Sequence, residues 1–155
     1  MDPYDKEKTR QIWKRVLGEE DSEDGCAFDS ERLRAMIERE KTSACNYAAL
    51  ARCAGGRCCE ALRRLSQEES CHAKQLETVF FLWTGEPSCA AAGPLMKFRC
   101  IAEALRELHQ QEMEAAKQYR RTAEELPEFR DLFLQLATDE TRHAGQLRCL
   151  LQNYV

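Results

Sequence analysis

Four glutamates occupy positions where a helical repeat calls for an apolar side chain. Glu40, Glu69, Glu112 and Glu140 each interrupt a stripe of apolar residues spaced three and four apart, the spacing of one face of an α-helix. A buried, unpaired carboxylate is strongly unfavourable or takes up a proton. Four such stripes facing one core therefore require cations between the helices, and this constrains the fold more than any other feature.

Helix signals dominate the 155 residues, which contain only seven Gly and four Pro. We expect a short amphipathic helix over 6–17, followed by the acidic loop EEDSEDG. Longer helices are expected from about 30 to the break at Ala54-Gly55-Gly56, over 57–83, over 96–125, and from 129 to about 150, with a connector over 84–94. Four long helices and one short one predict an all-α bundle. We expect residues 1–28 to form an N-terminal helix and acidic loop, and 29–155 to form the four-helix domain.

Composition excludes several classes of function. The 23 basic and 27 acidic residues give a net charge of −4 with no block of one sign, which argues against a nucleic-acid partner. The longest nearly apolar stretch, Val79–Trp83, is too short to cross a membrane. The first thirty residues are acidic and lack the apolar segment of a secretory signal. We therefore expect a soluble, cytoplasmic protein.

The nine cysteines have irregular spacing and include no C-x-x-C pair, which excludes zinc-ribbon and rubredoxin-type sites. We expect most of them to be reduced thiols that serve as small buried residues. The alternative is a redox role for some of them, centred on the adjacent pair Cys58-Cys59.

An internal repeat relates the two halves of the chain. Each half contains Glu-x6-Tyr, which places both side chains on one helix face, followed by Glu-x-x-His. The first glutamate and the Glu-x-x-His are separated by 29 residues in one half and by 28 in the other. The repeated residues are Glu40, Tyr47, Glu69 and His72 in the first half and Glu112, Tyr119, Glu140 and His143 in the second.

The positions of the turns support pairing within each half. The midpoint between Glu40 and Glu69 falls on Ala54-Gly55-Gly56, and the midpoint between Glu112 and Glu140 falls on Leu126-Pro127. In an antiparallel hairpin, residues equally distant from the turn lie level with each other. Each hairpin therefore brings its single glutamate beside its Glu-x-x-His.

One glutamate from each of two helices plus Glu-x-x-His from each of two others is the ligand set of di-iron and di-manganese carboxylate bundles. Carboxylate oxygens with one imidazole per ion suit iron or manganese, whereas thiolates would suit zinc or clusters. The third histidine, His109, has arginine at the −3 position and is expected at the surface or rim.

The motifs E40-K-T-S-A-C-N-Y47, E69-x-x-H72, E112-x6-Y119 and D139-E-T-R-H143 resemble the ferritin-like superfamily, and specifically its rubrerythrin branch, over about residues 29–153. The resemblance implies a ferritin-like bundle with a crossover connection that makes 57–83 and 96–125 parallel. By the same resemblance, Glu69 and Glu140 would bridge two irons, and Glu40 and Glu112 would be terminal ligands. His72 and His143 would each bind one iron. Tyr47 and Tyr119 would hydrogen-bond the carboxylates. Asp139 would orient His72, and Glu68 would orient His143.

The chain departs from the family pattern in three ways, of which the first is an N-terminal helix before residue 29 that is not part of the family core. It has no C-x-x-C from which a rubredoxin domain could be built, and Ala115 stands where many rubrerythrins carry a further carboxylate. The resemblance nevertheless implies a di-iron peroxidase of oxidative stress defence, a homodimer that reduces hydrogen peroxide with electrons from an external donor such as a rubredoxin-like protein. Tyr47 and Tyr119 would be its catalytic hydrogen-bond donors.

Two alternatives remain at the level of sequence. The same ligands would serve a ferroxidase, an O₂-activating site or a di-manganese catalase. A ferritin-like interaction module with a vestigial site is the other, because Cys71 stands in the first Glu-x-x-His where the second has Arg142.

Overall fold

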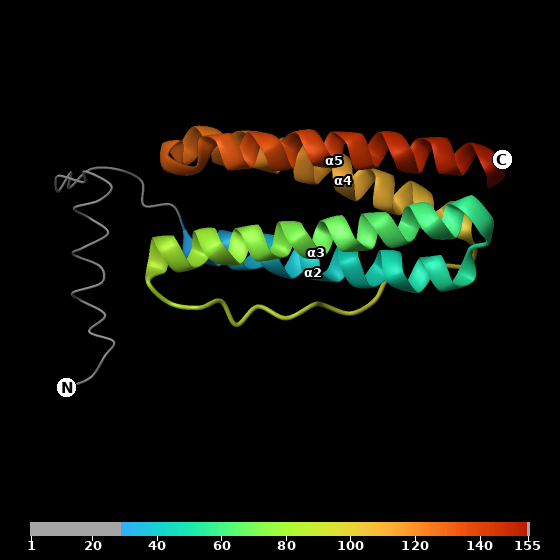
Figure 1. The fold of residues 1–155 in the computed structure, drawn as a ribbon, viewed down its shortest axis with the longest axis horizontal. Coiled ribbons are helices and arrows are strands. Elements are labelled where there is room, and N and C mark those ends of the chain that lie inside the picture. Colours follow the sequence, from blue (N-terminus) through green and yellow to red (C-terminus); the bar gives the residue numbers. More distant parts are fainter. Residues whose placement is uncertain (1–28, 155) are drawn as a thin grey trace.

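The computed structural model describes residues 29–154, which form four long α-helices and two 3-10 helices with no strand among them (Figure 1). This confirms the all-α class and is compatible with a four-helix bundle. The predicted N-terminal helix and acidic loop lie outside the described residues. The elements are α2 (Ser30–Cys53), α3 (Gly56–Thr84), α4 (Ile101–Glu125), η1 (Pro127–Phe129), α5 (Arg130–Leu151) and η2 (Gln152–Tyr154).

Local sequence determines where the helices begin and end. The Asp29 side chain accepts a hydrogen bond of 2.9 Å from the backbone N–H of Glu31 and so caps α2. Gly56 begins α3 with φ +53°, and Gly85 ends it with φ +75°, both in the left-handed region that favours glycine. Pro127 lies in η1, which separates α4 from α5.

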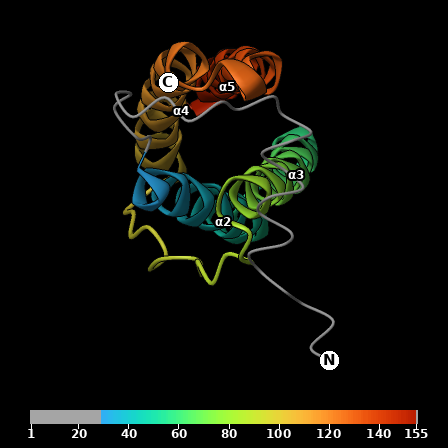
Figure 2. The ribbon, with the colours of Figure 1, turned by 90° about the vertical axis from the view of Figure 1, so that its left-hand side faces the viewer.

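Contacts between helices define their directions. Ion pairs join Arg32 to Glu125 and Lys41 to Glu77, while Tyr47 donates to Glu112, so α2 runs antiparallel to both α3 and α4. Helices α3 and α4 consequently run in the same direction. In Figure 1 the connector between them returns along the outside of the bundle, and Figure 2 shows the four helices end-on.

The connector is longer than predicted, because α4 begins at Ile101 rather than at Met96. The side chains of α2 bind the connector backbone. Met96 N–H donates to Asn46 Oδ1 (2.8 Å) and Gly93 N–H to Thr42 Oγ1 (2.8 Å), while Lys41 Nζ donates to the carbonyl of Ala90 (2.6 Å). These tertiary bonds hold residues 90–96 extended. Phe98 therefore packs against the core from the connector and not from a helix.

The apolar core divides into two clusters at opposite ends of the bundle. One is centred on residues such as Leu33, Leu76, Tyr119 and Phe133, and the other includes Tyr47, Leu62, Leu105 and Leu147. Buried glutamates and histidines separate the clusters along all four helices. None of the described helices is long and apolar enough to cross a membrane.

The cysteines correct one expectation. Of the eight in the described part of the chain, six are exposed, Cys59 is half-buried and only Cys58 is buried. Cys58 belongs to an apolar core cluster and Cys59 packs against it, but the six exposed cysteines do not serve as core residues. All eight are free thiols.

Candidate metal centre

Six predicted site residues meet between the two apolar clusters. Every one is at most 5% exposed, because each stands in the inward stripe of its helix. They are Glu40 from α2, Glu69 and His72 from α3, Glu112 from α4, and Glu140 and His143 from α5.

Two of the carboxylates reach both histidines. Nδ1 of His72 lies 3.3 Å from Oε2 of Glu69 and 3.0 Å from Oε1 of Glu140. Nδ1 of His143 lies 2.7 Å from the other oxygen of Glu69 and 3.4 Å from the other oxygen of Glu140. The imidazole rings stack with centroids 5.4 Å apart. Each of these carboxylates thus offers one oxygen toward each imidazole.

The other two carboxylates lie at the sides of this group and receive hydrogen bonds from tyrosines. Tyr119 of α4 donates to Oε1 of Glu40 on α2, and Tyr47 of α2 donates to Oε1 of Glu112 on α4. The remaining oxygen of Glu40 lies 3.6 Å from Nδ1 of His72. Both tyrosines are fully buried, so each is fixed on its carboxylate by packing.

Seven buried polar atoms at the centre make no well-aligned hydrogen bond, and their nearest polar neighbours are one another, as pairs of imidazole nitrogen and carboxylate oxygen. Buried polar groups are almost always satisfied, and an unsatisfied carboxylate in the core is strongly unfavourable. These atoms come from α2, α3 and α5 and belong to one cluster. They are Oε2 of Glu40, both oxygens of Glu69, both oxygens of Glu140, and Nδ1 of His72 and of His143.

The outward nitrogens of the histidines face carboxylates on the opposite hairpin. Nε2 of His143 lies 2.7 Å from Glu68, and Nε2 of His72 lies 3.6 Å from Asp139, the pairing that the resemblance implied. Arg142 joins these two carboxylates, with Nη2 donating to Glu68 (2.8 Å) and to Asp139 (3.0 Å). A carboxylate on the far nitrogen directs the imidazole's other nitrogen, here Nδ1, toward the centre.

Protons balance the buried charge of the cluster. Burial acts to lower the pKa of both histidines, but the carboxylates of Glu140, Glu40 and Glu69 outweigh it at His72 and raise its pKa to about 12. The carboxylates of Glu140 and Glu69 likewise raise the pKa of His143 to about 10. Both imidazoles are therefore cationic at neutral pH, and a metal ion must displace their protons.

The four carboxyl groups of the cluster differ in the direction in which their pKa values are shifted. Burial raises the pKa of Glu69 to about 7 and raises that of Glu112, which also faces Glu140, well above its usual range. Burial acts in the same direction at Glu140 and Glu40, but their hydrogen-bonding neighbours, chiefly Glu112 and His143 for Glu140 and His72 for Glu40, lower both pKa values. The neighbours of Glu40 and Glu140 thus favour the ionised form, whereas burial favours the protonated form of Glu69 and Glu112.

One residue of the site was missed by the sequence analysis. Arg39 reaches Oε1 of Glu40 with Nε (3.3 Å) and Nη2 (3.0 Å), donates to Gln118, and lies over the ring of Tyr119 with Cζ 4.9 Å from the centroid. Its position next to Glu40 in the sequence did not predict the contact, because the side chains of consecutive helix residues point about 100° apart. The contact could have been predicted from the antiparallel packing of α2 and α4. Arg39 lies at the same height along the bundle as Gln118, just as Arg32 lies at the same height as Glu125.

The donor atoms suit hard or borderline cations. Glu69, His72, Glu140 and His143 offer ligand atoms that all lie within 4.8 Å of one another, a buried group that could hold a metal ion. Carboxylate oxygens in excess of imidazole nitrogens favour iron or manganese over metals that select sulfur. Because the atoms without a well-aligned hydrogen bond are the ones aimed at the centre, the residues fit such a group.

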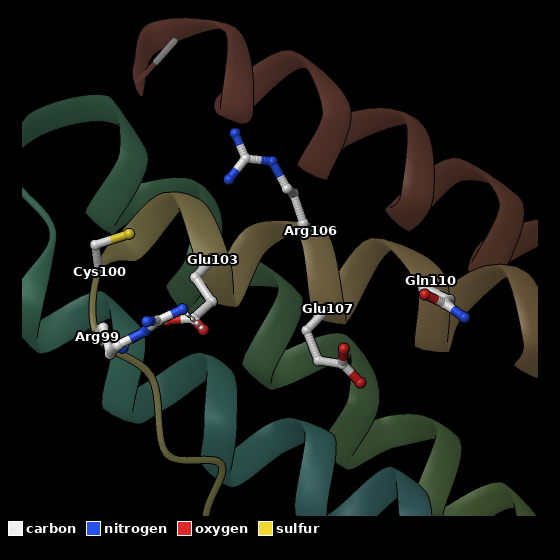
Figure 3. A pocket seen from close by; sticks show the side chains of 6 residues that line it. All are labelled: Arg99, Cys100, Glu103, Arg106, Glu107 and Gln110. Atoms are coloured by element: carbon white, nitrogen blue, oxygen red, sulfur yellow. Dashed lines mark hydrogen bonds and ion pairs between the residues drawn. The ribbon is translucent and has the colours of Figure 1, made fainter.

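The surface hollows lie outside the cluster. One of about 600 Å³ follows the outer face of α4, where Arg99 and Glu103 form an ion pair, and none of the six clustered residues lines it (Figure 3). Another of about 500 Å³ lies between α2 and α4 and reaches Arg39 and Ala115. His109 is half-buried on α4, in keeping with the predicted rim position.

Comparison with known proteins finds no match, either to a protein family or to a curated protein. Any function of this chain must therefore be argued from the site itself.

Proposed function

We propose that this protein is a ferritin-like, two-metal oxidoreductase of the rubrerythrin type that reduces hydrogen peroxide. Its cofactor would be two iron ions, with Glu69 and Glu140 shared between them, His72 and Glu40 on one ion, and His143 and Glu112 on the other. When bound, two ferrous ions would supply one electron each to cleave the O–O bond, and two protons would complete the two water molecules.

The observation that carries the proposal is a buried cluster of seven carboxylate and imidazole atoms that face one another and make no well-aligned hydrogen bond. A structural role alone would satisfy these groups with donors, or replace them with apolar residues at lower cost. The crossed pairs Tyr47–Glu112 and Tyr119–Glu40, and the carboxylates behind both imidazoles, repeat the same design on both hairpins. This duplication is what two equivalent ions would require.

The connectivity supports the ferritin-like part of the proposal. Helices α3 and α4 run in the same direction, and the connector over 85–100 is bound along α2 rather than forming a short turn. The choice of peroxide as oxidant is supported by the resemblance of the Asp139–His143 run and the Glu-x6-Tyr pairs to rubrerythrins.

The protein's own residues would have three roles. Glu69 and Glu140 would accommodate changes of metal charge, because a carboxylate can shift between bridging and terminal binding. Tyr47 and Tyr119 would hold the terminal carboxylates in place and offer hydroxyl protons at the centre. A small oxidant would approach from the hollow between α2 and α4, whose lining includes Ala115 and Arg39, the residue that contacts Glu40.

The test begins with metal content. We expect apo protein to bind two Fe(II) per chain under anaerobic conditions, and one equivalent of peroxide to oxidise both within the mixing time, giving a near-ultraviolet absorption band. A Glu69→Ala, Glu140→Ala double variant should bind neither ion, whereas Glu60→Ala, outside the cluster on α3, should behave as wild type. Failure of the wild-type protein to bind iron or manganese would instead support an interaction module.

The oxidants are then compared directly. Faster oxidation of di-ferrous protein by peroxide than by air-saturated buffer supports the peroxidase. The opposite order would identify a ferroxidase or O₂-activating enzyme. Dismutation of peroxide by manganese-loaded protein alone, without any reductant, would identify a catalase.

A further inference from the structure

The repeat makes the two sides of the metal centre almost equivalent, and one residue breaks the equivalence. Glu40 corresponds to Glu112, so Arg39 corresponds to Gln111. The guanidinium of Arg39 contacts Glu40 through two nitrogens. Gln111 instead donates to Glu107 on its own helix (3.0 Å), although it lines the same hollow between α2 and α4 as Arg39.

The two terminal carboxylates therefore have different surroundings. Oε1 of Glu40 accepts from both Tyr119 and Arg39, which leaves Oε2 as its one oxygen without a well-aligned hydrogen bond. Oε1 of Glu112 accepts from Tyr47 alone. Arginine is permanently charged, and its contact with Gln118 and with the Tyr119 ring holds the guanidinium in place.

A fixed positive charge beside one ligand carboxylate opposes binding of a cation there. The side chain of Glu40 is 2% exposed and that of Arg39 is 26% exposed, so water screens this charge only in part. Among residues 29–154, the structure gives Glu112 no cationic partner of this kind.

We propose that Arg39 makes the two metal positions unequal, so that the ion held by His143 and Glu112 binds before, and more tightly than, the ion held by His72 and Glu40. This inference rests on the two-metal centre proposed above. Arg39 acts as a positioning residue through Glu40. It lets a half-loaded protein exist, in which one defined position is filled first.

The test is a titration of apo protein with Co(II), whose visible absorption reports each ion without any catalysis. We expect two steps whose dissociation constants differ by roughly 10-fold or more. Arg39→Gln, which installs the residue of the other half, should tighten the weaker step and merge the two. Arg39→Lys keeps the charge and should preserve the separation.

Controls assign the positions. Arg34→Gln removes the same charge from α2 at a residue that pairs with Glu31 and lies over Phe80, so both steps should be unchanged. Glu112→Ala should remove the tighter step, and Glu40→Ala the weaker one. Gln111→Arg provides a second variant if Arg39→Gln does not fold, and it should weaken the tighter step.

Two equal steps in the wild-type protein, or a separation that survives Arg39→Gln, would overturn the inference while leaving the two-metal centre intact. Loss of the tighter step in Glu40→Ala would also overturn it, because the order of filling would be reversed. Absence of any Co(II) or Fe(II) binding would instead overturn the proposed function.

Discussion

The two buried tyrosines give a matched pair of variants at the scale of single residues. Tyr47→Phe leaves Oε1 of Glu112 without a donor, whereas Tyr119→Phe leaves Glu40 with Arg39. A hydrogen bond to a charged group contributes about 1.5–3 kcal/mol. We expect Tyr47→Phe to weaken one Co(II) step by roughly 10-fold or more and Tyr119→Phe to weaken the other by less, measured by titration. Equal losses in both variants would mean that Arg39 does not hold Glu40.

The histidines make metal-free protein sensitive to pH. In the folded state the pKa of His72 is raised to about 12 and that of His143 to about 10, whereas the pKa of an unfolded histidine is about 6.5. The protonated histidines therefore stabilise the fold fully below about pH 6.5, and this stabilisation is lost as the pH rises toward 10–12. Glu69, with a pKa raised to about 7, acts in the same direction from about pH 4.5 upward. We expect the free energy of unfolding to fall between pH 6.5 and 9.5 by at most about 1.4 kcal/mol per pH unit for each histidine.

Urea unfolding at several pH values measures this slope. His109→Ala, which removes the histidine outside the cluster, should retain it, whereas protein loaded with Mn(II) should lose it because the imidazoles are then already deprotonated. Metal-free protein whose stability is flat over this range would show that the imidazoles are not held cationic by Glu69 and Glu140.

The role of a single residue could be predicted from the sequence where that residue interrupts a periodic apolar stripe. Glu40, Glu69, Glu112 and Glu140 break an apolar stripe, so their burial and their convergence followed from the sequence. Arg39 breaks no stripe, and its role arises only when α4 brings Gln118 and Tyr119 alongside. The cysteines were mispredicted for the converse reason, because composition suggested burial while four of them lie on exposed helix faces and two in the connector.

At the scale of elements, two glycines should respond oppositely to the same change. Gly56 starts α3 with φ +53°, and an added Cβ would meet no neighbour, so Gly56→Ala adds only backbone strain, about 1–2 kcal/mol. Gly145 lies inside α5 with nothing within 4 Å of an added Cβ, so Gly145→Ala should stabilise by about 0.5–1 kcal/mol. Urea midpoints of the metal-free variants test both. A stabilised Gly56→Ala protein would mean that the α2–α3 turn is not held as described.

Helix boundaries were predictable where the chain carries its own stop signal, as at Ala54-Gly55-Gly56 and Pro127. The start of α4 was not, because residues 96–100 have a helical pattern and no breaker. Their non-helical conformation depends on Asn46 and on packing of Phe98, which are tertiary contacts. Such contacts override local propensity, and a single sequence does not reveal them.

At the scale of the whole molecule, the thiols and the candidate metal centre are separate. Cys53, Cys58 and Cys59 lie around the α2–α3 turn, and Cys58 precedes Glu69 by eleven residues, about 16 Å along α3. Leu62 and Leu65 of the apolar cluster fill the space between. Within residues 29–154, no second group of three or more metal-binding side chains comes together.

This separation predicts how the proposed peroxidase should turn over. The di-ferrous form should react once with peroxide and stop as the di-ferric form, because no second redox centre within the described residues can return electrons to the cluster. Continuous consumption of peroxide should begin only when a reductant is added, either a rubredoxin-like protein with its reductase or a chemical donor. A peroxide electrode, with and without the donor, measures both phases. Cys58→Ala plus Cys59→Ala should leave the two rates unchanged, since the leucines between the turn and the cluster insulate these thiols. Sustained turnover with a dithiol alone that disappears in this double variant would show instead that the thiols deliver electrons.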